Sequence, residues 1–220
     1  MVDPQLQEAA ERLAQKIKHN IITSSGHTID GASIEEFYQA FCLAIREEIM
    51  INWMASLDTI KDQKVRIAHY FSMEYLPGRI TYNNFANIGA TDLVQATLAL
   101  MNRRIEEVLA VEPDPGLGNG GLGRLASCLL DSMATLHYPT RGYGLRYQYG
   151  IFEQEIWDGL QVERPDTWLL NCNPWEVRRD AFATHVHFGG QVTFAKNILG
   201  EEIYLLEDGD EEIDENESIS

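Results

Sequence analysis

The stretch Gly116-Leu-Gly-Asn-Gly-Gly-Leu-Gly123 is followed directly by Arg124 and an amphipathic run, and it decides the interpretation of the chain. Glycine adopts backbone conformations that are closed to other residues, so such a loop lets its N–H groups approach a ligand closely. A helix that begins at the loop adds its unpaired N–H groups and the positive end of its dipole. The stretch therefore predicts a phosphate-binding site at a helix N-terminus.

The run after the loop predicts a helix with one buried face. Its apolar residues recur at helical spacing, and they are Leu122, Leu125, Ala126, Leu129, Leu130 and Met133. Cys128 falls near this face, so we expect it to be a small core residue.

The glycines leave two other interpretations open. The loop matches G-x-G-x-x-G twice, a pattern found in dinucleotide-binding oxidoreductases, where a β-strand must lead into the loop. Here residues 103–111 have helical spacing instead, and Glu112-Pro-Asp-Pro115 ends that helix. No Gly-Lys-Ser/Thr occurs in the chain, so a Walker-type loop is excluded. The other alternative is a glycine-rich turn that only lets two helices pack closely.

Three further blocks accompany the glycine loop in a fixed order. They are Tyr70-Phe-Ser-Met-Glu-Tyr-Leu-Pro-Gly-Arg79, Tyr143-Gly-Leu-Arg-Tyr-Gln-Tyr-Gly-Ile-Phe-Glu-Gln154, and Asp166-Thr-Trp-Leu169 with Asn173-Pro-Trp-Glu176. Together with Asp114–Leu136, they resemble the α-glucan phosphorylases, the glycogen, starch and maltodextrin enzymes. The likeness extends from about Val65 to about Phe188.

The resemblance implies a glycosyltransferase of the glycogen phosphorylase type that uses pyridoxal 5'-phosphate. Such an enzyme cleaves the terminal α-1,4 bond of a glucan with inorganic phosphate and reversibly releases glucose-1-phosphate. The phosphate of the cofactor, rather than its aldehyde, exchanges a proton with the substrate phosphate. Its partners would be the glucan, the phosphate and a second subunit in a homodimer.

The resemblance also implies roles for individual residues. The amides around Gly120, Gly121 and Leu122 would face the substrate phosphate or sugar, and Asn119 would lie beside the cofactor. Two residues are expected to support the loop: Arg124, and Glu74 at the end of the strand-like run Val65–Ser72. Without the resemblance, Glu74 is interpreted as a turn or helix-capping carboxylate.

Other parts of the implied active site are missing from the chain. In this family the Schiff-base lysine, the cations that hold the phosphates and the histidine that contacts the sugar lie in a second domain. The lysines here stand in none of the matching blocks, and they are Lys16, Lys18, Lys61, Lys64 and Lys196. We therefore expect an amino-terminal fragment that has no complete set of catalytic residues and is inactive alone. A non-catalytic product that dimerises or binds glucan is the alternative.

The expected fold class is mixed α/β, the leading part of a two-lobed, GT-B-like glycosyltransferase fold. Residues 1–200 would form an incomplete amino-terminal domain, with a helical scaffold over 1–60. Asp3 before Pro4 predicts the start of a first helix, and Ser33-Ile-Glu-Glu36 predicts a capping box for a second. Strands and turns are expected after residue 143. Residues 201–220 hold ten acidic and no basic side chains, which predicts a disordered tail or loop.

The composition excludes several other classes of protein. A net charge of −17 argues against nucleic acid as a partner. There is neither an apolar stretch long enough to cross a membrane nor a signal peptide, so we expect a cytoplasmic protein. The three cysteines show no metal or disulfide spacing. His185 and His187 form an isolated pair, which we interpret as a packing or surface feature and not as a metal site.

Overall fold

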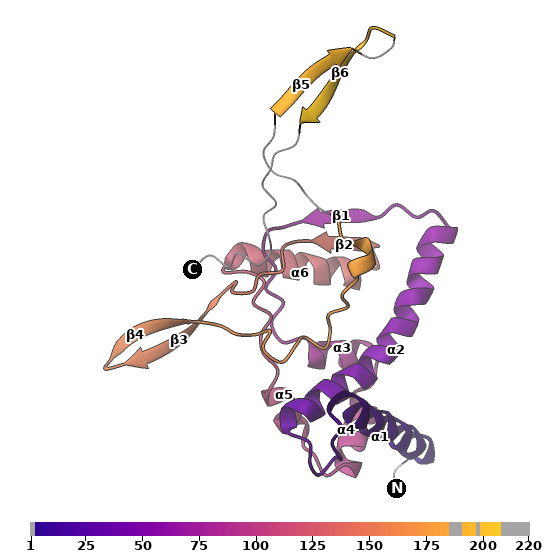
Figure 1. The fold of residues 1–220 in the computed structure, drawn as a ribbon. Helices are drawn as coiled ribbons and strands as arrows, with labels where there is room; N and C mark the ends of the chain where they lie inside the picture. The colour runs from indigo at the N-terminus through magenta and orange to yellow at the C-terminus, as the bar shows by residue number, and fades with distance from the viewer. Residues whose placement is uncertain (1–2, 185–190, 197–198, 208–220) are drawn as a thin grey trace. The chain divides into compact units, whose positions relative to one another are not determined.

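The computed structural model describes residues 3–184, 191–196 and 199–207. The chain divides into two compact units, residues 1–176 and residues 177–220. The first unit contains helices α1 to α6 and strands β1 to β4, and the second contains a 3₁₀ turn and strands β5 and β6 (Figure 1). Mixed helix and strand agree with the α/β class expected from the sequence.

The helices of the first unit are α1 (Pro4–Ser25), α2 (Ile34–Asp62), α3 (Thr81–Asn87), α4 (Thr91–Leu100), α5 (Ile105–Ala110) and α6 (Gly121–Thr135). Its strands are β1 (Ala68–Phe71), β2 (Thr140–Tyr143), β3 (Phe152–Trp157) and β4 (Leu160–Pro165). The elements of the second unit are η1 (Asp180–Phe182), β5 (Gln191–Lys196) and β6 (Glu202–Glu207).

Both predicted helix starts are confirmed. The side chain of Asp3 accepts a hydrogen bond from the amide of Gln5 at 3.0 Å, with Pro4 as the first residue of α1. At α2, the amide of Glu36 donates to Ser33 Oγ at 3.2 Å, and the Ser33 amide donates to the Glu36 carboxylate at 2.9 Å. These reciprocal bonds satisfy donors that the helix itself leaves unpaired.

The hydrophobic core lies among α1, α2, α3, α4 and α5. Its largest fully buried side chains include Ile17, Phe37, Phe41, Phe85 and Leu98. The rings of Phe41 and Phe85 meet edge to face, with centroids 6.3 Å apart. The apolar repeat along α2 therefore has the predicted packing role in the first half of the helix. In the second half the side chain of Trp53 is exposed.

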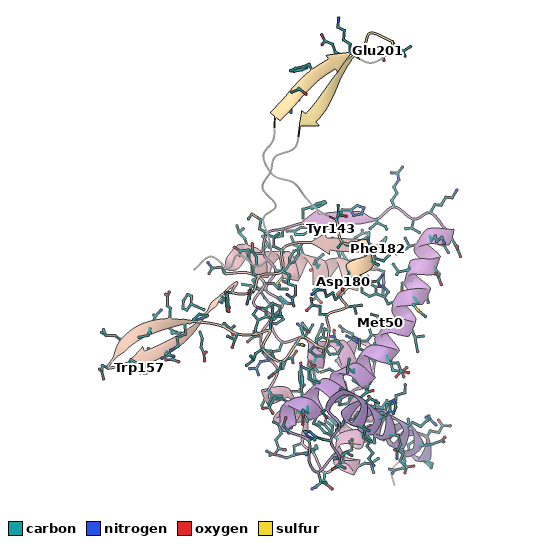
Figure 2. All side chains as sticks on the ribbon, viewed as in Figure 1. Met50, Tyr143, Trp157, Asp180, Phe182 and Glu201 are labelled. Atoms are coloured by element: carbon teal, nitrogen blue, oxygen red, sulfur yellow. The ribbon has the colours of Figure 1, made fainter. Side chains whose placement is uncertain are left out.

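Two small sheets complete the first unit. β1 and β2 pair in parallel, in a register that opposes Phe71 to Tyr143. β3 and β4 form an antiparallel hairpin closed by Asp158 and Gly159, both with positive φ, as a two-residue hairpin turn requires. Trp157 stands at the outer end of this hairpin (Figure 2).

In the second unit, β5 and β6 form an antiparallel pair. The strand expected at residues 191–194 is confirmed by β5. β6 lies within the segment 201–220 that we expect to be an acidic tail or loop. Residues 208–220 lie outside the described residues, as do His185 and His187, so those predictions remain open.

The prediction for the buried face of α6 is partly wrong. Ala126 is buried, and Leu130 and Met133 are half-buried against the β1–β2 sheet. By contrast, the side chains of Leu122, Leu125 and Leu129 are 77%, 52% and 39% exposed. Cys128 is also exposed, so it is not the core residue that we expected. The physical reason is that α6 packs on one side only among the described residues.

Candidate functional site

The glycine loop, residues 116–123, is positioned by the backbone that follows β1. The amide of Tyr75 donates to the carbonyl of Leu117 at 2.8 Å, and the amide of Leu76 donates to the carbonyl of Gly123 at 3.0 Å. Residues 111–120 connect α5 to α6 and include the first part of the loop, and none of them is in a strand. A dinucleotide-binding loop follows directly after a β-strand, and residues 111–120 contain no such strand.

Glu74 reaches the loop from this same backbone segment. Its Oε2 accepts hydrogen bonds from the amides of Asn119 at 3.2 Å and Gly120 at 3.3 Å. Gly120 is the N-cap residue of α6 and has no side chain to cap the helix, and Glu74 binds the amides of the N-cap residue and of the residue before it, not those of the first helical turn. A negative charge next to a helix N-terminus is also favoured by the helix dipole.

The first amides of α6 remain available to a ligand. Within the described part of the chain, the N–H groups of Gly121, Leu122 and Gly123 have no hydrogen-bond acceptor. A Cβ added at Gly120 or at Gly121 would meet no heavy atom within 4 Å. Unpaired donors beside open space at the positive end of a helix can bind an anion such as phosphate.

The other glycines of the loop are explained by packing. A Cβ at Gly118 or Gly123 would lie 2.9 Å or 3.0 Å from the Cβ of Glu74. A Cβ at Gly116 would lie 2.7 Å from Cδ1 of Trp168. These three glycines therefore allow close packing, although against Glu74 and Trp168, which lie outside the helices, and not between two helices as the alternative interpretation has it. Packing does not account for the open space at Gly120 and Gly121.

The guanidinium of Arg124 contacts the backbone segment after β1 that also positions the loop. Its Nη1 donates to the carbonyls of Leu76 at 3.2 Å and Pro77 at 3.0 Å. These bonds tie the first turn of α6 to the backbone after Glu74. Glu74 thus contacts the loop from the segment after β1, and Arg124 contacts that segment from α6.

Two residues near the loop were missed as site residues by the sequence analysis. Glu112 is only 4% exposed, and its Oε1 accepts hydrogen bonds from the amides of Ile80 at 2.9 Å and Thr81 at 3.0 Å, where α3 begins. Trp168 is 5% exposed, and its Nε1 donates to the carbonyl of Tyr147 at 3.2 Å. Their partners lie 31 and 21 residues away in the sequence, so no local pattern could have identified them.

A cavity of about 560 Å³ adjoins the loop. The residues that line it are mostly apolar and include Tyr75, Leu117, Leu130, Trp168 and Trp175. Its charged residues are Arg146 and Glu176, which form an ion pair with an N–O distance of 2.7 Å. The cavity therefore offers an apolar wall and a neutralised charge pair beside Leu117 of the loop.

Two further kinds of site were sought among the described residues. No group of three or more His, Cys, Asp or Glu side chains is placed to hold a metal ion there. None of the described helices combines the length and the apolar composition that a membrane crossing requires.

The family model for carbohydrate phosphorylase matches residues 98–212, which is more than half of the chain. The chain belongs to the carbohydrate phosphorylases. Glycogen phosphorylase from Chlamydia trachomatis is 40% identical over 91% of the chain, and that from Bacillus subtilis is 40% identical over 83%. The chloroplastic/amyloplastic L-2 α-1,4 glucan phosphorylase of Solanum tuberosum is 42% identical over 80%.

This phosphorylase chain spans about a quarter of the length of its relatives, 25% for the Chlamydia enzyme and 23% for the Bacillus enzyme. The match to the Chlamydia enzyme covers 201 of the 220 residues, so it includes both Glu74 and the glycine loop. The resemblance found in the sequence is thereby confirmed at the level of the family.

Proposed function

We propose that the chain supplies the glycine-loop wall of the active site of an α-1,4-glucan phosphorylase. The reaction takes a glucan and inorganic phosphate to glucose-1-phosphate and a shortened glucan. The observation that carries the proposal is the row of amides at Gly121, Leu122 and Gly123, which lack acceptors among the described residues. Membership of the carbohydrate phosphorylases supports phosphate as the anion that these donors would bind.

The proposed role of the loop is electrostatic. The amides around Gly120, Gly121 and Leu122 would face the substrate phosphate or sugar, because Gly120 and Gly121 carry no Cβ that would keep a ligand away from the backbone. Amides fixed in advance stabilise developing negative charge without reorganising during the reaction. Glu74 fixes them, since its carboxylate holds the amides of Asn119 and Gly120 immediately before the helix.

The charge of Glu74 also implies that the site needs cations. A carboxylate beside a phosphate dianion is unfavourable unless positive charge balances it. Arg124 keeps its single positive charge while its Nη1 donates to the carbonyls of Leu76 and Pro77, so it can balance the carboxylate but not a phosphate dianion as well. We infer that the balancing cations come from the part of the phosphorylase outside this chain.

The loop fits part of a pyridoxal 5'-phosphate site. Its chemistry suits a phosphate group, and we propose that Asn119 lies beside the cofactor. When bound, the cofactor would supply a phosphate that exchanges a proton with the substrate phosphate. We further propose that its attachment lysine belongs to the second lobe of a GT-B-like fold, and that residues 1–200 belong to the first lobe. A cytoplasmic homodimer is the assembly that we propose for the whole enzyme.

A chimera tests the function. In the Bacillus subtilis glycogen phosphorylase, the matched segment is replaced by the present chain, and glucose-1-phosphate release from glycogen and phosphate is measured. We expect an active chimera, whereas the 220-residue chain alone should show no turnover. The Gly121→Ala chimera should lose about 100-fold in turnover, because displacement of a bound group by about 1 Å has effects of that size.

The controls separate folding from chemistry. The chimera and its Gly121→Ala variant should have the same unfolding midpoint, since the added Cβ meets no atom of the chain. A folded chimera that retains pyridoxal phosphate but releases no glucose-1-phosphate would contradict the proposed function. Full activity of the Gly121→Ala variant would mean that the loop only has a packing role.

A further inference from the structure

The indole of Trp168 lies against the first residue of the glycine loop. A Cβ added at Gly116 would lie 2.7 Å from Cδ1 and 2.8 Å from Nε1 of this ring. The side chain of Trp168 is buried, with 5% of the residue exposed. A buried ring so close to the backbone limits the positions that the start of the loop can take, and only a residue without a Cβ fits there.

The same indole also binds a second segment that contacts the loop. Its Nε1 donates a hydrogen bond to the carbonyl of Tyr147 at 3.2 Å. Three residues further along, a Cβ added at Gly150 would lie 2.8 Å from the carbonyl carbon of Gly116 and 3.1 Å from the amide nitrogen of Gly118. Trp168 therefore contacts the loop directly through its ring, and through Nε1 it holds the segment that contacts the loop a second time.

The segment that carries Trp168 is bonded to the hydrophobic core. Gln39, on α2, donates through Nε2 to the carbonyls of Asn171 at 3.0 Å and Cys172 at 3.1 Å. The same part of α2 buries Phe37 completely. The indole is thus connected to the core through bonds that do not involve the loop.

We propose that Trp168 is a positioning residue for phosphorolysis, acting through Gly116 on the unpaired amides at the start of α6. The proposal rests on the proposed function of those amides. Residues 116–120 lead directly into α6, so a displacement at Gly116 reaches Gly121 through five peptide units. Donors aimed at developing charge are effective only while their positions are fixed. Because Trp168 is buried, it acts through the loop and not by contact with the substrate.

Hydrogen exchange measures the position of the loop separately from activity. The protein is the chimera of Bacillus subtilis glycogen phosphorylase that carries the present chain. The change is Trp168→Phe, which removes Nε1 and its hydrogen bond. Release of the loop would expose the two amides that Glu74 binds. We expect the peptide over residues 116–123 to exchange at least about tenfold faster than in the unchanged chimera.

Trp175→Phe is the matched control. Trp175 lines the same cavity, and its Nε1 donates to Thr81 Oγ1 at 3.1 Å, so this change removes an indole hydrogen bond of the same kind. No glycine of the loop has Trp175 among its nearest neighbours. Trp175→Phe should therefore lower the thermal unfolding midpoint about as much as Trp168→Phe does, but leave the exchange of the loop peptide unchanged.

Kinetics separate positioning from a general loss of structure. In the Trp168→Phe chimera, kcat for glucose-1-phosphate release should fall by about tenfold, because small displacements of groups at the reacting centre have large effects on rate. The KM for phosphate should change by less than about twofold, which is the pattern for donors that act mainly in the transition state.

Gly116→Ala tests the contact from its other side. The added Cβ would push the loop away from an unchanged indole, so kcat should again fall by about tenfold. The double variant should lose less than the product of the two single effects, because both changes act through one contact. Gly116→Ala also repeats the exchange measurement if Trp168→Phe fails to fold.

Three outcomes would overturn the inference. They are unchanged exchange of the loop peptide in a folded Trp168→Phe chimera, an equal increase of exchange with Trp175→Phe, and effects on kcat that multiply in the double variant. Any of them in an active chimera would retain the proposed function and remove the positioning role of Trp168. A folded but inactive chimera in which Trp168→Phe still speeds loop exchange would contradict the proposed function and support the hold of Trp168 on the loop.

Discussion

Each glycine of the loop has a distinct physical reason. Gly116 faces the indole of Trp168, which cannot move aside because it is buried and its Nε1 is bonded to the carbonyl of Tyr147. Gly121 faces open space. Packing therefore explains glycine at residue 116 and does not explain it at residue 121, although the two positions are only five residues apart.

This difference predicts that the same substitution destabilises the chain at Gly116 but hardly at Gly121. Gly116→Ala should lower the free energy of unfolding by about 1–3 kcal/mol, the usual cost of overpacking. Gly121→Ala should change it by less than about 0.5 kcal/mol, as at a surface site without contacts. Urea unfolding of the 220-residue chain, followed by circular dichroism, measures both. Equal losses for the two variants would contradict the packing assigned to Gly116.

At the scale of single residues, the sequence predicted the glycine loop but not every residue near it. The glycines and the helix start after them were recognisable locally, and the family resemblance singled out Glu74. Glu112 was interpreted only as part of a helix-ending segment. Its role as the acceptor for the Ile80 and Thr81 amides depends on a contact across 31 residues, which no single sequence reveals.

Among the elements, a buried polar cluster joins α2, α3 and the segment before residue 176. The hydroxyl of Thr81 lies 3.0 Å from Tyr38 Oη and 3.7 Å from Cys42 Sγ, and it accepts a hydrogen bond from Trp175 Nε1 at 3.1 Å. Burial raises the pKa of the Cys42 thiol to about 12 and raises that of the Tyr38 hydroxyl above its usual range. Both groups are therefore neutral in the folded chain well above neutral pH.

The raised pKa values predict loss of stability in alkali. In the unfolded chain Cys42 releases its proton near pH 9.0, whereas the folded chain retains it to about pH 12. The contribution of Cys42 to the free energy of unfolding should thus be constant below pH 9 and fall between pH 9 and 12, by up to about 1.4 kcal/mol per pH unit. Urea midpoints at pH 7 to 11 measure the slope.

Cys42→Ala provides the control for this titration. It removes the contribution of the thiol and leaves that of Tyr38, which begins at about pH 10.0. The slope between pH 9 and 10 should therefore flatten in the variant. An unchanged slope would mean that the thiol is not protected by burial.

The helices were more predictable than their environment. Periodicity and capping signals placed α1, α2, α5 and α6, because these signals are local. The exposure of α6 was predicted wrongly, since apolar periodicity indicates only that a face is suited to burial. Whether another element covers that face depends on contacts between elements, and Leu122, Leu125 and Leu129 stay exposed among the described residues.

At the scale of the whole molecule, the two units differ in what stabilises them. The first contains the hydrophobic core, whose members extend from Leu13 to Val108 with Trp175 packed against them. The second has an antiparallel strand pair as its largest element. Since an isolated hairpin is marginally stable in water, the first unit should determine the unfolding transition.

Truncated chains test whether the first unit determines the unfolding transition. A chain of residues 1–176 should keep its thermal midpoint within about 4 °C of the full chain, by circular dichroism at 222 nm. A chain that ends at residue 165 is the control, and it should unfold at a clearly lower temperature because Trp168 and Trp175 are removed. A large drop for residues 1–176 would show that the second unit contributes to the core.

The contact between Gly150 and the loop affects how these proteins can diverge. A Cβ at Gly150 would overlap the carbonyl oxygen of Gly116. A substitution at residue 150 would therefore displace the glycine loop from 34 positions away. Residue 150 is thus restricted to glycine by the course of the backbone at Gly116, and the shape of the loop depends on a position that no inspection of the loop sequence alone would include.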